Sequence, residues 1–127
     1  MTSASTSTST STSEGAPALF RPLTLRSLAL ANRIVVSPMC QYSAVDGSPG
    51  PWHHAHLGGL AMSGASLVFV EATAVESVGR ISPGDTSLCT DDNERAFADV
   101  LRVMRAAGPA HVGIQLAHAG RKSSCGI

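Results

Sequence analysis

The chain has 127 residues, with nine basic and nine acidic side chains, so its formal net charge is zero. This balance offers no electrostatic footprint for nucleic acid or an anionic membrane surface, and no apolar run approaches the ~18 residues of a membrane span. The three cysteines, Cys40, Cys89 and Cys125, are widely spaced and include no CxxC pair. We therefore expect reduced thiols and a cytoplasmic protein, not a disulfide framework.

The first segment, residues 1–16, consists mainly of Ser and Thr. It has neither the apolar core of a signal peptide nor the arginines of a mitochondrial transit peptide. Because such a segment has almost nothing to bury, we expect a disordered tail. The folded part is expected over residues 17–127.

A small hairpin is expected first. Leucines alternate with a polar residue at Leu23–Leu25, which suits a short half-buried strand, and Ala29–Leu30 can pair with it. Ile34–Val36 follows as a continuous apolar run, which is typical of a parallel strand buried on both faces. Pro38 has no backbone N–H to donate, so this strand has to end near it.

The rest of the chain alternates helices with apolar strands. The predicted elements, in order, are a helix over Trp52–Met62 with Pro51 in its first turn, a strand over Ser66–Val75, a helix that Asp91 or Asp92 caps and Gly108 ends, and a strand over His111–Leu116. This order implies parallel strands joined by right-handed helical crossovers. Open doubly wound sheets and closed barrels both begin in this way, so periodicity alone does not choose between these α/β folds.

Polar or functional residues occur at the carboxyl end of each predicted strand, where parallel sheets bind ligands. They are Ser37, Pro38, Met39, Cys40 and Tyr42 after the first strand, Glu71, Ala72 and Thr73 in the second, and Gln115 and His118 in and after the third. An amide in an otherwise apolar strand costs about 1–3 kcal/mol if it is left unpaired. Gln115 therefore needs a partner, which is either neighbouring backbone or a ligand with an amide-like edge.

One cysteine and one pair of histidines are further candidates for chemical or metal-binding sites. Cys40 is a metal ligand, a nucleophile, a redox group or, as with most buried cysteines, an inert core residue. His53 and His56 lie three apart on one side of a predicted helix, but no second cluster of ligands accompanies them, so we assign no metal site. The absence of GxGxxG, P-loop and GxSxG patterns weighs against Rossmann, nucleotidase and hydrolase assignments.

Several segments together resemble the old yellow enzyme family of FMN-dependent oxidoreductases, and especially the group with a cysteine beside the flavin. They are LFRPLTLRSLALANRIVVSPMCQY, PWHHAHLGGLAMSGASLVFVEATAV, GRISPGD and GIQLAHAGRK. The family fold is an eight-stranded parallel β/α barrel with an N-terminal hairpin closing its bottom, so the resemblance favours the TIM barrel. Since a full barrel needs ~250 residues, the chain is expected to be its N-terminal part and to end after about the third barrel strand.

The resemblance also implies a site. The residues expected to line the isoalloxazine ring of FMN are Ser37, Pro38, Met39, Cys40, Ala72 and Gln115. Gln115 would bond the pyrimidine edge of the flavin, Cys40 would tune its reduction potential without attacking substrate, and Tyr42 would donate a hydrogen bond to the substrate. NAD(P)H would reduce the flavin, which would then pass hydride to the β-carbon of an activated alkene.

The implied function is that of an NAD(P)H:flavin oxidoreductase, or ene-reductase, acting on small enone-type substrates in a family that is often homo-oligomeric. The family's substrate-gripping His pair (or His/Asn), its tyrosine proton donor and its FMN phosphate site all lie downstream of the quoted segments. We therefore expect the 127 residues alone to be inactive. Two alternatives stay open: a non-catalytic truncated barrel without cofactor, and a small metal-binding domain using His53, His56 and Cys40.

Overall fold

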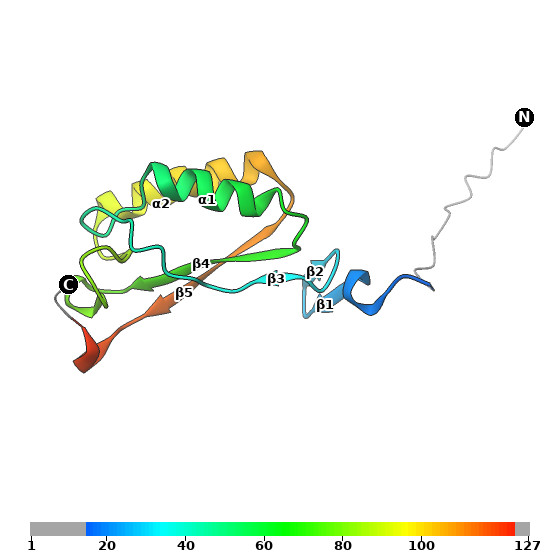
Figure 1. Ribbon diagram of the computed structural model, residues 1–127, viewed down its shortest axis with the longest axis horizontal. Helices are drawn as coiled ribbons and strands as arrows, with labels where there is room; N and C mark the ends of the chain where they lie inside the picture. Colours follow the sequence, from blue (N-terminus) through cyan, green and yellow to red (C-terminus); the bar gives the residue numbers. More distant parts are fainter. Residues whose placement is uncertain (1–14, 124–127) are drawn as a thin grey trace, which may run out of the picture.

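The computed structural model describes residues 15–123 (Figure 1). The strands are β1 (Leu23–Leu25), β2 (Leu28–Leu30), β3 (Val35–Val36), β4 (Leu67–Ala74) and β5 (His111–Ala117), and the α-helices are α1 (Pro51–Ala61) and α2 (Asp91–Ala107). Short 3-10 turns occur at Ala18–Phe20, Ser77–Gly79 and Gly120–Lys122. The predicted tail lies outside the described residues, apart from its last two positions, and so does Cys125.

The predicted hairpin is confirmed. β1 and β2 pair antiparallel, with Leu23 opposite Leu30. Figure 1 shows the hairpin beyond the end of the main sheet where β3 begins. Asn32 ties it to that sheet: its side chain donates to the Gly64 carbonyl at 2.8 Å, and its backbone N–H donates to the Ser66 hydroxyl at 2.7 Å. The chain therefore enters β3 from a fixed point.

The main sheet is parallel, in the order β3-β4-β5. Val36 lies opposite Val68, and Val70 lies opposite Ile114. Both α-helices lie on one face of this sheet (Figure 1). The predicted strand–helix–strand–helix–strand order with parallel pairing is thus confirmed, and all three strands end at the same edge.

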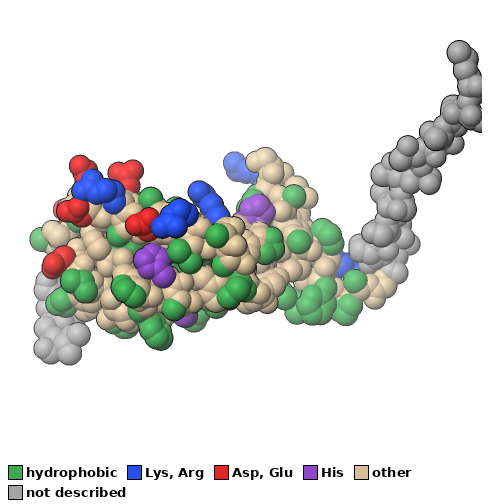
Figure 2. Space-filling view, turned by 90° about the horizontal axis from the view of Figure 1, so that it is seen from above, with side chains coloured by type: hydrophobic (Ala, Val, Ile, Leu, Met, Phe, Trp, Pro, Cys, Tyr) green, Lys and Arg blue, Asp and Glu red, His purple; other side chains and the backbone are tan. Residues whose placement is uncertain are grey.

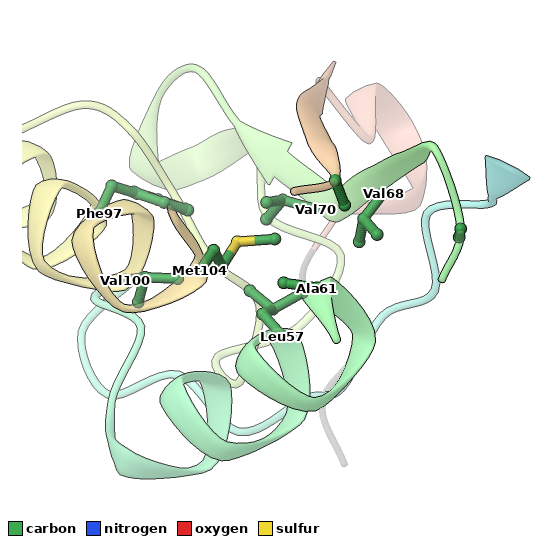
Figure 3. Packing of buried hydrophobic residues seen from close by; sticks show 9 residues of the cluster. Leu57, Ala61, Val68, Val70, Phe97, Val100 and Met104 are labelled. Carbon is green, nitrogen blue, oxygen red and sulfur yellow. The ribbon is translucent and has the colours of Figure 1, made fainter. Parts of the chain in front are cut away.

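The hydrophobic core lies between the two helices and the sheet. Figure 3 shows side chains of α1, α2 and β4 converging there. The buried members of this cluster are Leu57, Ala61, Ala65, Val68, Val70, Phe97, Val100, Met104 and Ala110. Burial of this apolar area is the main force that holds the helices on the sheet.

The opposite face of the sheet is open. Val35 of β3 is 46% exposed, and Gln115 of β5 is exposed on the same face. The prediction that Ile34–Val36 is buried on both faces is therefore wrong for the described part of the chain. Within residues 15–123 no second layer packs against that face, so the apolar side chains there have no partner to cover them.

The start of α2 differs from the sequence prediction. Its N-cap is Thr90, whose hydroxyl accepts from the Asn93 N–H at 3.2 Å, and not Asp91 or Asp92. Thr90 has the extended backbone that an N-cap requires, whereas both aspartates already lie in the first helical turn. There their negative charges interact favourably with the positive end of the helix dipole. Figure 2, a view onto the helix layer, shows acidic side chains gathered at the end where α2 begins.

Neither α1 nor α2 has the length and apolar character that a membrane crossing requires, and this finding covers the described residues only.

Gly108 is needed where α2 ends beside α1. A Cβ at this position would lie 2.0 Å from the carbonyl oxygen of Ala61, which is backbone and cannot rotate away. We expect Gly108→Ala to destabilise the chain by about 1–3 kcal/mol, the usual cost of overpacking. Gly59→Ala is the control, since nothing lies within 4 Å of its added Cβ; there, in a helix, alanine is expected to stabilise by about 0.5–1 kcal/mol. Urea unfolding of both variants measures the difference, and equal midpoints would contradict the close approach.

Candidate active site

The predicted site residues meet at the carboxyl edge of the parallel sheet. The segment 37–42 follows β3 and crosses the end of β4, where the Ala72 backbone approaches the Cys40 thiol. Ala72 in turn lies opposite Gln115 in the β4–β5 pairing. The structure therefore brings Cys40, Ala72 and Gln115 into one row across three neighbouring strands.

The segment 37–42 ends in a constrained backbone. Tyr42 has a φ of +51°, in the left-handed region that few non-glycine residues adopt. Its carbonyl faces Gly84, where a Cβ would lie 2.6 Å away, and the next turn is fixed because Ala44 N–H donates to the Gly84 carbonyl at 2.9 Å. Tyr42 is 56% exposed, so its side chain is accessible from solvent.

Glu71 is a buried carboxylate beside this segment. The β4–β5 pairing skips it, because Val70 pairs with Ile114 and Ala72 with Gln115. Its side chain is 3% exposed and accepts a hydrogen bond from His53 Nε2 of α1 at 2.8 Å. Its second oxygen accepts from the backbone N–H of Gln41.

Burial and the nearby carboxylates raise the pKa values of both Cys40 and Tyr42. Burial, followed by the charges of Asp85 and Glu71, raises the pKa of the Cys40 thiol, although the Ala72 backbone partly opposes this. The charge of a Cys40 thiolate is the largest cause that raises the pKa of Tyr42, and the same carboxylates add to it. Both groups therefore stay protonated near neutral pH, as hydrogen-bond donors.

Gln115 lies on the open face of the sheet. It shares that face with Gly113, over which the Phe69 ring lies so closely that a Cβ would meet it at 2.5 Å. The amide is exposed, and no described residue hydrogen-bonds to it. The predicted cost of an unpaired buried amide therefore does not arise in residues 15–123, and its partner stays a prediction.

The remaining predicted residues follow β3 directly. Ser37 and Met39 are exposed and Pro38 is half-buried. Ser37 and Met39 line a small cavity of about 10 Å³ together with His53 and Glu71. This space is about that of one water molecule.

A family model described as NADH:flavin oxidoreductase / NADH oxidase family matches residues 18–126. The chain belongs to this family. An NADH:flavin oxidoreductase of Gibberella zeae is 40% identical over 124 residues, which are 98% of this chain and 30% of that protein. An NADPH dehydrogenase of Bacillus subtilis is 43% identical over 110 residues, which are 85% of this chain and 32% of that protein.

Solved structures agree with this assignment. Morphinone reductase superposes with a TM-score of 0.76 at 32% identity, over 88% of this chain and 29% of that one. Another of its structures, in complex with tetrahydroNAD, matches at 31% identity with the same TM-score. The predicted membership of the old yellow enzyme family and the prediction of the N-terminal part of a TIM barrel are confirmed. The chain spans roughly 30% of the length of these relatives.

The histidines of the metal hypothesis lie in different surroundings. His53 is buried against Glu71, whereas His56 stacks on Trp52 with ring centroids 6.0 Å apart. Across residues 15–123, no three His, Cys, Asp or Glu side chains come together as metal ligands.

The sequence did not predict what holds the segment 37–42, which carries Cys40, in place. It placed Glu71 at the edge of the sheet, but gave no role to Gln41 and did not pair Glu71 with His53. One signal was available: a carboxylate within an apolar strand needs partners as much as the Gln115 amide does. Sequence alone does not say which partners those are.

Proposed function

We propose that this chain supplies one side of the FMN site in an NAD(P)H-dependent oxidoreductase that reduces activated C=C bonds of small enone-type molecules. The observation that carries the proposal is the row of thiol, small residue and amide, Cys40–Ala72–Gln115, across three strand ends in a member of this family. By the same proposal the 127 residues alone are inactive, because they span about 30% of their relatives.

The residues present fit a flavin. Ala72 has the small side chain that close approach of a flat ring requires, and the exposed Gln115 amide offers one donor and one acceptor to a ring edge. The residues that would hold FMN are Ser37, Pro38, Met39, Cys40, Ala72 and Gln115. Ligands in such folds bind at the carboxyl ends of the strands, which is where these residues lie.

FMN, when bound, supplies hydride transfer between NAD(P)H and the alkene. The chain's own part is to orient and to donate hydrogen bonds. Cys40, kept protonated by burial and by two carboxylates, presents an S–H donor toward the ring. Tyr42, also kept protonated, presents an O–H donor to a substrate carbonyl from its exposed position. Polarising that carbonyl would activate the conjugated C=C bond.

Gln115 provides the first test, in a complete barrel in which residues 15–123 replace the matching part of the Bacillus subtilis NADPH dehydrogenase. Gln115→Leu removes a donor and an acceptor, so we expect FMN affinity to fall by about 1–3 kcal/mol. Fluorescence titration of the apo-barrel measures the affinity, and its melting temperature checks that the variant is folded. Equal FMN affinity in a folded variant would show that Gln115 does not contact the flavin.

Cys40→Ala in the same barrel tests the thiol. An S–H donor stabilises the electron-rich reduced flavin, so its loss is expected to lower the reduction potential by about 10–30 mV, equivalent to a hydrogen bond of about 0.5–1.5 kcal/mol. FMN should remain bound. Cys89→Ala is the matched control, because Cys89 is exposed in the loop before α2. Dye equilibration measures the potentials, and an unchanged value for Cys40→Ala would remove its role.

A further inference from the structure

Glu71 connects three separate parts of the molecule. It belongs to β4, its Oε1 accepts from His53 of α1 at 2.8 Å, and its Oε2 accepts from the backbone of Gln41. The strand pairing skips Glu71, as in a β-bulge, and bulges beside active sites commonly re-aim one side chain. Here the re-aimed side chain points away from the ladder, toward α1 and the segment after β3.

The orientation of His53 is set by a second hydrogen bond. The Gly50 N–H donates to Nδ1 at 3.1 Å, so Nδ1 carries no proton and Nε2 carries the proton donated to Glu71. His53 is 1% exposed and Glu71 is 3% exposed. A carboxylate buried this deeply is costly unless donors satisfy it, and this one has a donor for each oxygen.

Gln41 is the residue between Cys40 and Tyr42 in the chain, and it is held at several points. Besides its backbone bond to Glu71, its side-chain nitrogen donates to the Met39 carbonyl at 2.7 Å, and its side-chain oxygen accepts from Trp52 Nε1 at 3.1 Å. Whatever holds Gln41 therefore determines where the thiol and the phenol lie.

We infer that Glu71 and His53 are positioning residues that lock the Cys40–Tyr42 segment onto α1 and β4. The consequence for flavin chemistry rests on the proposed function, but the lock itself does not. The same carboxylate also helps to keep the thiol protonated, since its charge is among the causes that raise the Cys40 pKa. Releasing the lock should therefore both expose the thiol and increase its thiolate fraction.

The test measures iodoacetamide alkylation of each cysteine in the dilute, folded 127-residue chain, by peptide mass spectrometry. Glu71→Gln keeps the size of the side chain, but its amide cannot accept from His53 and Gln41 together. We expect Cys40 to react several-fold faster while Cys89 is unchanged. Glu76→Gln is the matched control, because Glu76 also pairs with a histidine, His118 at 2.6 Å, but on the surface.

A pair of His53 variants keeps the test decisive if Glu71→Gln fails to fold. Glutamine places an amide N–H near the position of Nε2 and can still donate to Glu71, whereas asparagine reaches only the position of Nδ1. We expect His53→Asn to accelerate Cys40 alkylation and His53→Gln to stay close to wild type. Trp52, the chain's single tryptophan, provides a second signal, because its emission should change only in the variants that release Gln41.

The outcomes separate this inference from the proposed function. An unchanged Cys40 rate in folded Glu71→Gln, or an equal rise for Cys40 and Cys89, would show general support of the fold and overturn the lock. Neither result uses FMN, so the flavin proposal would stand or fall separately on the Gln115 and Cys40 variants of the complete barrel.

Discussion

Made on its own, the 127-residue chain is expected to self-associate, to retain no FMN and to oxidise no NAD(P)H in the presence of an enone. Within the described residues, β3 and β5 each have one unpaired edge, and such edges pair with other chains. Beside β5, an open pocket of about 800 Å³ is lined by apolar side chains that include Phe97, Leu101 and Ile114. Each exposed core-type side chain forfeits about 1.5–3 kcal/mol of burial, which association would recover.

Sedimentation velocity over a range of concentrations measures this association, and the visible absorbance of the purified protein measures bound flavin. The control is the complete barrel in which residues 15–123 replace the matching part of the Bacillus subtilis NADPH dehydrogenase, because a closed barrel has no free edges. That barrel should be yellow and should not associate through strand edges. A monomeric, FMN-loaded 127-residue chain would overturn the prediction.

Met104→Ala is expected to destabilise the core strongly. Met104 is 1% exposed, and Figure 3 shows it between α1, α2 and β4. Truncating a buried methionine costs about 2–5 kcal/mol, as lost transfer energy plus the cavity that remains. Since small domains have only about 5–15 kcal/mol of stability in total, this variant should lose a large fraction of it and unfold at a much lower urea concentration.

Met62→Ala is the matched control for that substitution. Met62 follows α1 and is 65% exposed, so the same truncation there removes little buried area. Circular dichroism during urea unfolding compares the two variants at equal dilute concentration. If both midpoints move equally, the core is not centred where the structure places it.

Local patterns in the sequence were sufficient for the secondary structure. The alternation at Leu23–Leu25 and the apolar stretches at Ser66–Val75 and His111–Leu116 predicted strands to within one residue at either end. Such patterns depend on neighbours along the chain, so they can be read from sequence. The cap of α2 could not, because Thr90, Asp91 and Asp92 are all good N-caps, and only the backbone conformation distinguishes them.

The parallel order of the strands also allowed part of the site to be predicted. Once β3, β4 and β5 run in parallel, their carboxyl ends share an edge, and Cys40, Ala72 and Gln115 have to lie near one another. Burial of Ile34–Val36 on both faces did not follow, because it needs a second layer that residues 15–123 do not contain.

What only the tertiary structure decided is the lock on the Cys40–Tyr42 segment. It depends on the strand pairing that skips Glu71, on α1 placing the His53 ring within 2.8 Å of that carboxylate, and on the Gln41 backbone arriving at its other oxygen. Glu71 lies 18 residues from His53 and 30 from Gln41 along the chain. Hydrogen bonds between such distant residues form only when packing brings them into range, so local patterning does not specify them.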